Sequence, residues 1–208
     1  MVPGGTIADV AGCPLRRQAY IDAAQRLFFS RGYGATSMNA IAAEVGGSKT
    51  TLWALFPSKL ALFEAVVEAI VRDYGRAVQV DLHGAPDVAA ALTRMGRSIM
   101  ETVMSAPVME MHRLVTGEAA RAPELGRVMY SLGPAEGMMR LAAYLHAQMM
   151  AGTLKRGDPR VAAQQFSGLC RGGVIDRRML GITNDDDAAM ANLEVDAAVA
   201  TFLAAWAA

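Results

Sequence analysis

The sequence has few of the residues on which metal sites, disulfide frameworks and most hydrolytic active sites depend. Among 208 residues there are two cysteines, Cys13 and Cys170, and three histidines. The cysteines lie far apart without metal-ligand spacing, so we predict reduced thiols, no disulfide framework and no metal site. The Gly-x-Ser-x-Gly, His-Glu-x-x-His and glycine-rich phosphate-binding motifs are also lacking. We therefore predict that the protein is not an enzyme and needs no cofactor.

Long apolar runs and a basic leader are lacking as well. Charged residues interrupt each apolar run before it is long enough to span a bilayer. Residues 1–14 have neither a basic leading region nor a continuous apolar segment, and we expect them to form a flexible N-terminal arm. With 53% hydrophobic and 19% charged residues the chain is not disordered. A soluble, cytoplasmic protein without a membrane partner is expected.

The formal net charge is zero, but the charge is unevenly distributed. Residues 1–60 carry six basic and three acidic residues, whereas the remainder carries fourteen basic and seventeen acidic residues. A modestly basic N-terminal part on a modestly acidic body is compatible with DNA binding by the N-terminal part alone.

Helical patterns dominate, and no alternating polar and apolar run bounded by hairpin turns is found. The predicted fold class is all-α, with about nine helices. The first helix is expected over residues 15–30, and the second and third begin at the N-caps Ser37 and Ser48. The fourth begins at Lys59 and is expected to continue to about Val80. Beyond it, proline- and glycine-rich segments separate further helices.

Two of these short helices meet at Gly46 and Gly47. Two short helices joined by a glycine-containing turn form the pattern of a helix-turn-helix, whose second helix enters the major groove of DNA. Here the second helix, over residues 48–56, begins with small polar side chains that can approach phosphates, base edges or thymine methyl groups. A plain helical hairpin with a capped second helix would give the same local pattern.

Residues 21–63 resemble the N-terminal domain of the tetracycline-repressor (TetR) family of transcriptional regulators. The matching positions are Ile21, Ala24, Leu27-Phe28, Arg31-Gly32-Tyr33, Thr36-Ser37, Ile41-Ala42, Val45-Gly46, Ser48-Lys49, Leu52, Phe56-Pro57-Ser58-Lys59 and Leu62-Phe63. The resemblance implies a three-helix DNA-binding domain over residues 15–60 and a helical ligand-binding and dimerisation domain over residues 61–208. The segment GEAARAPELGRVMYSLGP also resembles an AefR-type C-terminal domain.

The resemblance also implies which side chains meet DNA. Thr36, Ser37 and Lys59 would contact backbone phosphates, and residues 49–51 would face the groove. Ile41, Leu52 and Phe56 would be core. The predicted DNA-binding residues are Thr36, Ser37, Ser48, Lys49, Thr50, Thr51, Trp53 and Lys59.

Three positions depart from the usual pattern of the family. Gly47 stands where valine is common, Trp53 where tyrosine is common, and Ala54-Leu55 where histidine, arginine or tyrosine often occur. We expect Gly47 to loosen the turn. Trp53 keeps one hydrogen-bond donor for a phosphate, whereas Ala54 and Leu55 remove polar reach, so the resemblance predicts no base preference.

Methionine is concentrated in the C-terminal part, where 12 of the 14 methionines lie between Met95 and Met190. Methionine adapts to varied apolar partners, so the cluster fits a pliable cavity for a hydrophobic ligand, although an ordinary helical core would use the same residue. Two histidines in apolar segments are the favoured polar groups of this site. The predicted ligand-binding residues are Met100, Met104, Met111, His112, Val115, Tyr144 and His146.

The last two predicted helices, Pro159 to Leu180 and Asp185 to Ala207, correspond to the pair that forms the dimer interface in the family. Packing within one chain is the alternative. The acidic run at 185–187 is explained by attraction to a helix N-terminus. The predicted interface residues are Gly168, Gly172, Val195, Val199, Phe202 and Leu203.

Together these patterns predict a homodimeric regulator that binds a near-palindromic DNA operator and is released from it by a small hydrophobic ligand. Two other classes remain open at this point. One is a related dimer that binds small molecules but not DNA, because Ala54 and Leu55 lack polar reach. The other is a small helical enzyme, which the missing catalytic motifs disfavour.

Overall fold

The computed structural model describes residues 8–75 and 80–208, with side chains from residue 14 onward. The described residues form eleven α-helices and no strand, and their single bridge pairing joins Leu154 to Ala207. The prediction of an all-α fold is therefore confirmed. The chain divides into two compact units, one formed by residues up to 69 together with 114–129, the other by residues 70–113 together with 130–208.

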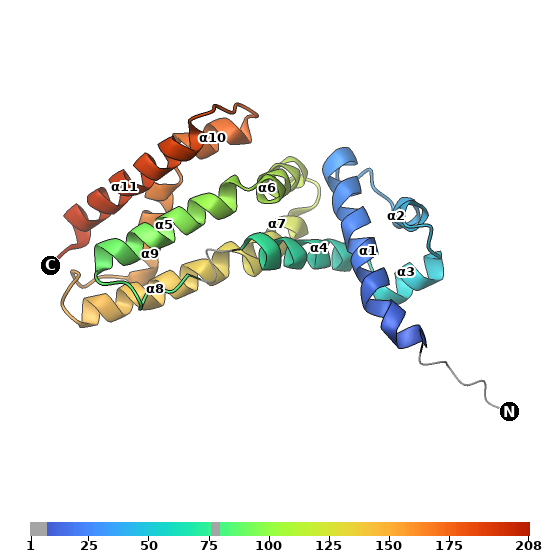
Figure 1. Cartoon of the computed structure of the whole chain (residues 1–208), viewed down its shortest axis with the longest axis horizontal. Helices are drawn as coiled ribbons and strands as arrows, with labels where there is room; N and C mark the ends of the chain where they lie inside the picture. Colours follow the sequence, from blue (N-terminus) through green and yellow to red (C-terminus); the bar gives the residue numbers. More distant parts are fainter. Residues whose placement is uncertain (1–7, 76–79) are drawn as a thin grey trace. The chain divides into compact units, whose positions relative to one another are not determined.

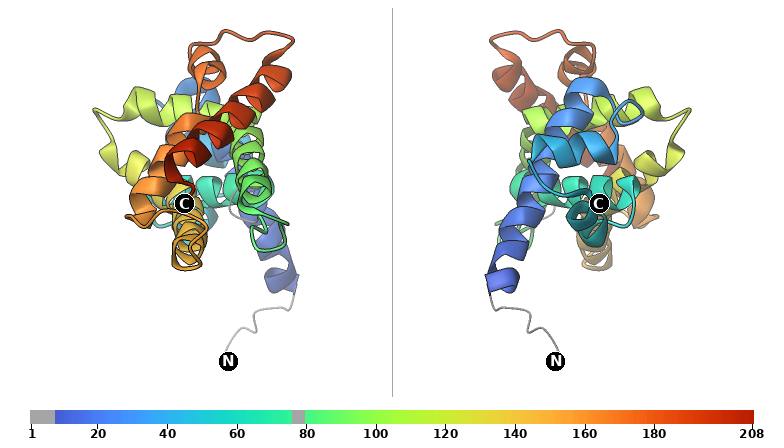
Figure 2. Two further views of the ribbon diagram at one scale, coloured as in Figure 1. Left: turned by 90° about the vertical axis from the view of Figure 1, so that its left-hand side faces the viewer. Right: turned by 90° about the vertical axis from the view of Figure 1, so that its right-hand side faces the viewer.

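The first unit contains the predicted helix-turn-helix. Its N-terminal helices are α1 (Ala8–Arg31), α2 (Met38–Glu44), α3 (Lys49–Leu55) and the larger part of α4 (Lys59–Tyr74). The end of α6 (Ala106–Glu118) and most of α7 (Pro123–Leu132) belong to the same unit. Helix α2 packs against both α1 and α3, as the views of Figures 1 and 2 show.

Serine side chains fix where the short helices of the first unit begin. The Ser37 hydroxyl accepts a hydrogen bond from the Ala40 amide, and the Ser48 hydroxyl accepts one from the Thr51 amide. The two predicted N-caps are thus confirmed. The turn between α2 and α3 contains Gly46, whose φ of +65° favours glycine because a Cβ atom is strained there. Caps and turn therefore follow directly from the local sequence.

The predicted core residues Ile41, Leu52 and Phe56 are buried, with at most 2% of their surface exposed. They are joined by three aromatic residues from α1, the loop after it and α4. Phe28, Tyr33 and Phe63 form a cluster whose ring centroids lie 5.3 to 6.1 Å apart. These ring contacts join α1, the loop after it and α4.

The second unit is built from α5 (Val88–Met104), α8 (Pro134–Met150), α9 (Pro159–Cys170), α10 (Gly173–Met179) and α11 (Asp187–Trp206), with the first half of α6. Helix α9 packs against α8, α5 and α11, and α11 also contacts α5 and α10 (Figure 1). The shared core includes Leu92, Leu145, Phe166, Val195 and Phe202.

Three helix boundaries differ from those predicted. Helix α1 begins at Ala8, so residues 8–14 are helical and only residues 1–7 of the expected arm lie outside the described residues. Helix α4 ends at Tyr74, before the expected end at Val80. The helix expected over 159–180 is two helices, separated at residues 171–172.

The break between α9 and α10 has a cause outside that segment. The Glu194 carboxylate, from α11, accepts a hydrogen bond from the Val174 amide at 3.1 Å. It also occupies the space beside Gly172, where an added Cβ would lie 2.9 Å from Glu194 Cδ. Glu194 therefore caps a new helix where a continuous one was expected, which accounts for one of the described helices beyond the predicted nine.

Helix α11 is strongly apolar, although it carries the acidic residues Asp187, Glu194 and Asp196. Among the described helices it alone has the length and composition of a membrane-spanning segment. Val195, Val199 and Phe202, however, lie in the core of the second unit. The helix is therefore a core helix of this unit, and its outer face includes the apolar side chain of Leu193 at 60% exposure.

Candidate nucleic-acid interface

The N-terminus of α3 presents polar side chains to solvent. Ser48 is its N-cap, and Lys49 and Thr50 follow it with exposed side chains. The Thr51 hydroxyl lies 2.8 Å from that of Ser48, so these two hydroxyls bond to each other. Ser48 and Thr51 are thus engaged with each other, whereas Lys49 and Thr50 present exposed side chains that can reach phosphates or base edges.

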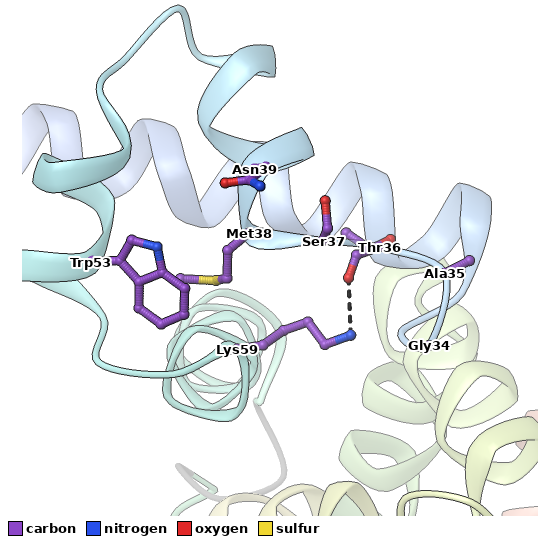
Figure 3. Close-up of a pocket in the computed structure, with 8 residues that line it drawn as sticks. All are labelled: Gly34, Ala35, Thr36, Ser37, Met38, Asn39, Trp53 and Lys59. Carbon is purple, nitrogen blue, oxygen red and sulfur yellow. Dashed lines mark hydrogen bonds between the residues drawn. The ribbon is translucent and has the colours of Figure 1, made fainter.

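A hollow of about 380 Å³ lies at the start of α2, bordered by Trp53 of α3 and Lys59 of α4, and is shown in Figure 3. It is lined by Gly34, Ala35, Thr36, Ser37, Met38, Asn39, Trp53 and Lys59. The Trp53 indole, from α3, is 48% exposed and lies beside Met38, while the Lys59 side chain extends from α4 toward Thr36. The structure thus brings together four predicted DNA-binding residues, three from helix starts and one from α3.

Asn39 is a polar residue of this hollow that the sequence analysis did not identify. It is exposed in the first turn of α2, two residues after the N-cap Ser37. A polar residue in the first turn after a predicted N-cap was the sequence signal that could have identified it. Its amide can both donate to and accept from a nucleic-acid backbone.

The Lys59 ammonium is bound to the loop between α1 and α2. It donates hydrogen bonds to the carbonyl oxygens of Tyr33 at 2.8 Å and Thr36 at 2.9 Å. It also lies 4.2 Å from the centroid of the Tyr33 ring, in a cation–π contact. Burial lowers the pKa of Lys59, and the nearby Glu118 carboxylate opposes this effect. One of its three N–H donors is left for a phosphate.

Thr36 is placed differently from the prediction. Its side chain is buried, with 2% exposure, and its hydroxyl donates to the carbonyl oxygen of Gly32 or Leu27, at 2.8 and 3.1 Å. A hydroxyl enclosed in this way does not reach a phosphate outside. The prediction that the Thr36 side chain contacts DNA is therefore wrong, and its role is to fix the loop that precedes α2.

Glu118, at the end of α6, is a charged neighbour of this loop. Its carboxylate accepts a hydrogen bond from the Gly34 amide at 2.9 Å. Burial raises the pKa of Tyr33, and the carboxylates of Glu124 and Glu118 raise it further, so both acids lie close to the same loop. Gly34 and Glu118 are 84 residues apart. No local pattern in the sequence connects them.

The predicted ligand-binding residues do not form one group. Met100 and Tyr144 lie together in the core of the second unit, with Met104 packed against it. Met111 is also buried, whereas Val115 belongs to the first unit. His146 is exposed on α8, so the prediction that it faces a pocket is wrong. It lies on the outer face of a helix whose inner face already packs on the core.

His112 has a strongly shifted pKa. Burial, together with the positive charge of Arg171, lowers the pKa of its imidazole from 6.5 to about 4. The imidazole is therefore neutral near pH 7 and offers one hydrogen-bond donor and one acceptor. His83, which the sequence analysis did not select, contacts the Tyr144 ring edge-on with centroids 5.6 Å apart.

Most of the predicted dimer-interface residues are buried inside the protomer. Val195 and Phe202 have no exposed surface and Val199 has 7%. These side chains cannot contact a second subunit, so the prediction that they form the dimer interface is wrong. They pack within the chain, which was the alternative. Leu203 packs against the same core. Gly172 is covered by Glu194, whereas Gly168 is exposed, with nothing within 4 Å of the position of a Cβ.

The acidic run at 185–187 lies at the start of α11. Asp187 is buried in its first turn and pairs with Arg177 at 3.3 Å and Arg178 at 3.9 Å. It also accepts from the Asn184 amide. Within residues 8–75 and 80–208 no group of three or more His, Cys, Asp and Glu side chains is arranged to hold a metal ion.

Two family models match the chain. Residues 21–66 match the model of bacterial regulatory proteins of the tetR family, which covers the helix-turn-helix described above. Residues 90–208 match that of the C-terminal domain of AefR-like transcriptional repressors. The second match alone covers more than half of the chain. Comparison with curated proteins gives no match.

Solved structures resemble the whole chain. A TetR-family transcriptional regulator from Mesorhizobium loti is 27% identical, with a TM-score of 0.79, over 94% of this chain and 98% of the other. The flavonoid-responsive regulator FrrA is 34% identical, with a TM-score of 0.77, over 93% and 98%. A TetR-family regulator from Pseudomonas syringae, 23% identical with a TM-score of 0.72 over 92% and 96%, shares the fold.

Proposed function

Because the chain belongs to the TetR family of transcriptional regulators, with a C-terminal domain of the AefR-like class, we propose that it represses transcription as a homodimer on a near-palindromic operator. The observation that carries this proposal is the capped start of α3, which exposes Lys49 and Thr50. It belongs to the same helix-turn-helix as the hollow lined by Ser37, Trp53 and Lys59. A small apolar effector then releases the protein from DNA.

In this proposal the two sets of residues have different tasks. Lys49 and Thr50 approach base edges from the N-terminus of α3, as in other helix-turn-helix proteins. Ser37, Trp53 and Lys59, together with Asn39, contact the sugar–phosphate backbone at the hollow and set the register of α3 in the groove. Ala54 and Leu55 follow in α3 without hydrogen-bonding side chains, so base readout is confined to the first turn of the helix.

A second copy of the chain is proposed to cover the apolar outer faces of α9 and α11. Val161 and Leu169 on α9 are 42% and 40% exposed, and Met190 and Leu193 on α11 are 36% and 60% exposed. Gly168, open above α9, permits a close approach of another helix. A two-fold dimer that reads two half-sites one turn of DNA apart must hold its two copies of α3 about 34 Å from each other.

We propose that the effector is a planar aromatic molecule of the flavonoid class. The support is the 34% identity to a flavonoid-responsive regulator over nearly the whole of both chains. The second unit offers suitable chemistry, since Met100 and Met104 adapt to flat apolar rings. Neutral His112 can donate to or accept from a phenolic hydroxyl without requiring an ionised ligand.

Helix α6 is the proposed route from effector to DNA. It carries His112 in the second unit and Glu118, six residues later, in the first. The Glu118 carboxylate holds the Gly34 amide, next to the loop that Lys59 and Thr36 fix. An effector that binds better to a shifted position of α6 would favour the state in which this contact is broken, and so lower the affinity for DNA.

Fluorescence anisotropy with labelled DNA that flanks the gene for this protein tests the proposal. The expected result is saturable binding that weakens steeply with salt and is reversed by a flavonoid but not by a straight-chain fatty acid. Tighter binding in the presence of flavonoid would refute release by the effector and leave DNA binding intact.

A second candidate function follows from the apolar side chains of Ala54 and Leu55, namely a dimer that binds small molecules but not DNA. Titration calorimetry with the same flavonoid separates the two. Flavonoid binding without any salt-dependent binding to the flanking DNA would favour the second function.

A further inference from the structure

We propose that Tyr20 is a positioning residue for the recognition helix α3, and that Gly47 is glycine because the Tyr20 hydroxyl occupies the space of its side chain. This inference rests on the proposed function, since it concerns how α3 is aimed at DNA. It identifies a residue on α1, away from the DNA-facing surface, on which operator binding depends.

The two adjacent glycines of the turn serve different purposes. Gly46 has a φ of +65°, and a Cβ added there would meet nothing within 4 Å, so its backbone conformation calls for glycine. Gly47 is not among the described glycines with positive φ, so its backbone accepts any residue. A Cβ at this position would, however, lie 2.1 Å from the Tyr20 hydroxyl oxygen and 3.0 Å from Tyr20 Cζ. Space, not conformation, requires glycine at 47.

The Tyr20 hydroxyl has a specific partner at the start of α3. Tyr20 is fully buried, and its hydroxyl donates to the Ser48 carbonyl oxygen at 3.3 Å. The same carbonyl accepts the first hydrogen bond of the helix, from the Leu52 amide at 3.2 Å. A buried phenol needs a hydrogen-bond partner. It therefore fixes the N-cap residue whose own hydroxyl caps α3.

Helix α1 also holds the other end of α3. The Arg17 guanidinium carbon lies 5.1 Å from the centroid of the Phe56 ring, and Phe56 is the C-cap of α3. Arg17 and Tyr20 are three residues apart and so lie on the same face of α1. One face of α1 thus contacts both ends of the seven-residue helix α3. Such a short helix has little stability of its own, so its direction is set by these contacts.

The structure changes what the missing side chain at position 47 implies. The sequence alone predicted that Gly47 loosens the turn. The Tyr20 hydroxyl instead fills that space and binds the next residue of the turn. Tyr20 and Gly47 are therefore a matched pair: a side chain at 47 would displace either the phenol or the start of α3.

The test is a double-mutant cycle with Gly47→Ala, Tyr20→Phe and the double variant, using Gly117→Ala as control because a Cβ there meets nothing within 4 Å. The probe is a labelled duplex that the unmodified protein enriches from a random-sequence library, compared with an unrelated duplex of equal length. Affinities are measured well below the melting temperature of each variant. The two substitutions should not act additively, because they share one contact.

We expect Gly47→Ala to bind the enriched duplex about tenfold more weakly, which corresponds to about 1.4 kcal/mol. Tyr20→Phe, which loses one hydrogen bond but keeps the ring, should bind about threefold more weakly. The double variant should bind more tightly than Gly47→Ala, since the 2.1 Å conflict with the hydroxyl is gone and only the 3.0 Å approach to the ring carbon Cζ remains. Binding of the unrelated duplex should change least. Gly47→Ala binding like the unmodified protein, or a double variant no tighter than Gly47→Ala, would overturn the inference.

A purely structural role would give a different result. If Tyr20 only stabilises the first unit, the variants lower the melting temperature while the folded protein keeps its affinity for the enriched duplex. The emission of Trp53, followed in a Trp206→Phe background, reports on α3 without DNA. We expect it to shift in Gly47→Ala and to return in the double variant, and an unshifted emission would also overturn the inference.

The outcomes separate this inference from the proposed function. If the unmodified protein enriches no duplex, DNA binding fails, and the Trp53 emission still decides whether Tyr20 positions α3. If Gly47→Ala does not fold, Tyr20→Phe remains informative, because unchanged affinity and unchanged Trp53 emission in that variant would refute the role of the hydroxyl.

Discussion

Replacement of Lys59 by methionine separates the two roles of its ammonium group. Methionine keeps the apolar stem but removes the hydrogen bonds to the Tyr33 and Thr36 carbonyls and the cation–π contact with the Tyr33 ring. Both carbonyls belong to buried residues. Lys59 itself is only partly buried. We therefore take the lower value of about 1 kcal/mol for each hydrogen bond and about 0.5–1 kcal/mol for the cation–π contact.

These contributions predict that Lys59→Met lowers the free energy of unfolding by about 2–3 kcal/mol. For a chain of this length that corresponds to a melting temperature lower by roughly 4–12 °C. Urea unfolding followed by circular dichroism measures the change. Lys49→Met is the matched control, because Lys49 is exposed at the start of α3. It should leave the free energy of unfolding within about 0.5 kcal/mol of the unmodified protein.

The Lys59→Met variant also tests whether the Lys59 ammonium group meets a phosphate. Each lost phosphate contact reduces the slope of log affinity against log salt by about 0.9, so a dimer with two lysines replaced loses about two. We expect this reduction in Lys59→Met. A free energy of unfolding that does not change in Lys59→Met would refute the fixing of the loop, and an unchanged salt slope would refute the phosphate contact.

Three further predictions concern His112, Glu118 and Leu193. Because the folded pKa of His112 is about 4 and its ordinary value is 6.5, the unfolded state binds the proton more readily; stability is fully present above pH 6.5 and falls as the pH is lowered toward 4. At 1.36 kcal/mol per pKa unit, this loss in the free energy of unfolding is about 3 kcal/mol. Urea unfolding at pH 7 and 4.5 measures it, and His112→Gln should lose less stability between these pH values than the unmodified protein. Glu118→Ala, which frees the Gly34 amide, should weaken binding of flanking DNA about three- to tenfold in anisotropy. Glu118→Gln keeps a hydrogen-bond acceptor and should bind DNA at least as tightly as the unmodified protein. Equal weakening in both variants would contradict the anchoring role of Glu118. Leu193→Arg places a charge among the exposed apolar side chains of α11 and should give a folded monomer in sedimentation velocity. A dimer of unchanged stability would refute the proposed interface at α9 and α11.

Local features of the first unit could be predicted from the sequence. Ser37 and Ser48 were recognised as N-caps because a short polar side chain before an apolar helical pattern has few other uses. Ile41, Leu52 and Phe56 were recognised as core because they fall on one face of short amphipathic helices. Both signals depend on residues within one or two helical turns of each other.

The wrong predictions arose where apolar residues occupied several faces of a helix, or where the contacting residue was far away in the sequence. Helix α11 has apolar residues on several faces, so its sequence did not show that Val195 and Phe202 face inward while Leu193 faces outward. The Glu118 contact with Gly34 joins residues 84 positions apart, and α10 exists because Glu194 reaches it from another helix. Such contacts become visible only when the chain is folded.

Thr36 and Gly47 show that the type of residue alone does not give its role. A threonine at a helix start can face DNA or, as here, bind a carbonyl beneath it. A glycine in a turn can provide flexibility or, as here, leave room for a neighbouring phenol. In both cases the decisive neighbour is on α1 or in the loop after it, outside the motif itself.

Footprinting on the DNA that flanks the gene for this protein tests most directly whether α3 reads an operator as part of a dimer. We predict protection of two related half-sites centred about 34 Å apart, one helical turn of 10–10.5 base pairs, with protection lost in Lys49→Ala and Thr50→Ala. Protection that spreads evenly over the fragment, or a pair of half-sites that survives both substitutions, would contradict recognition by the start of α3.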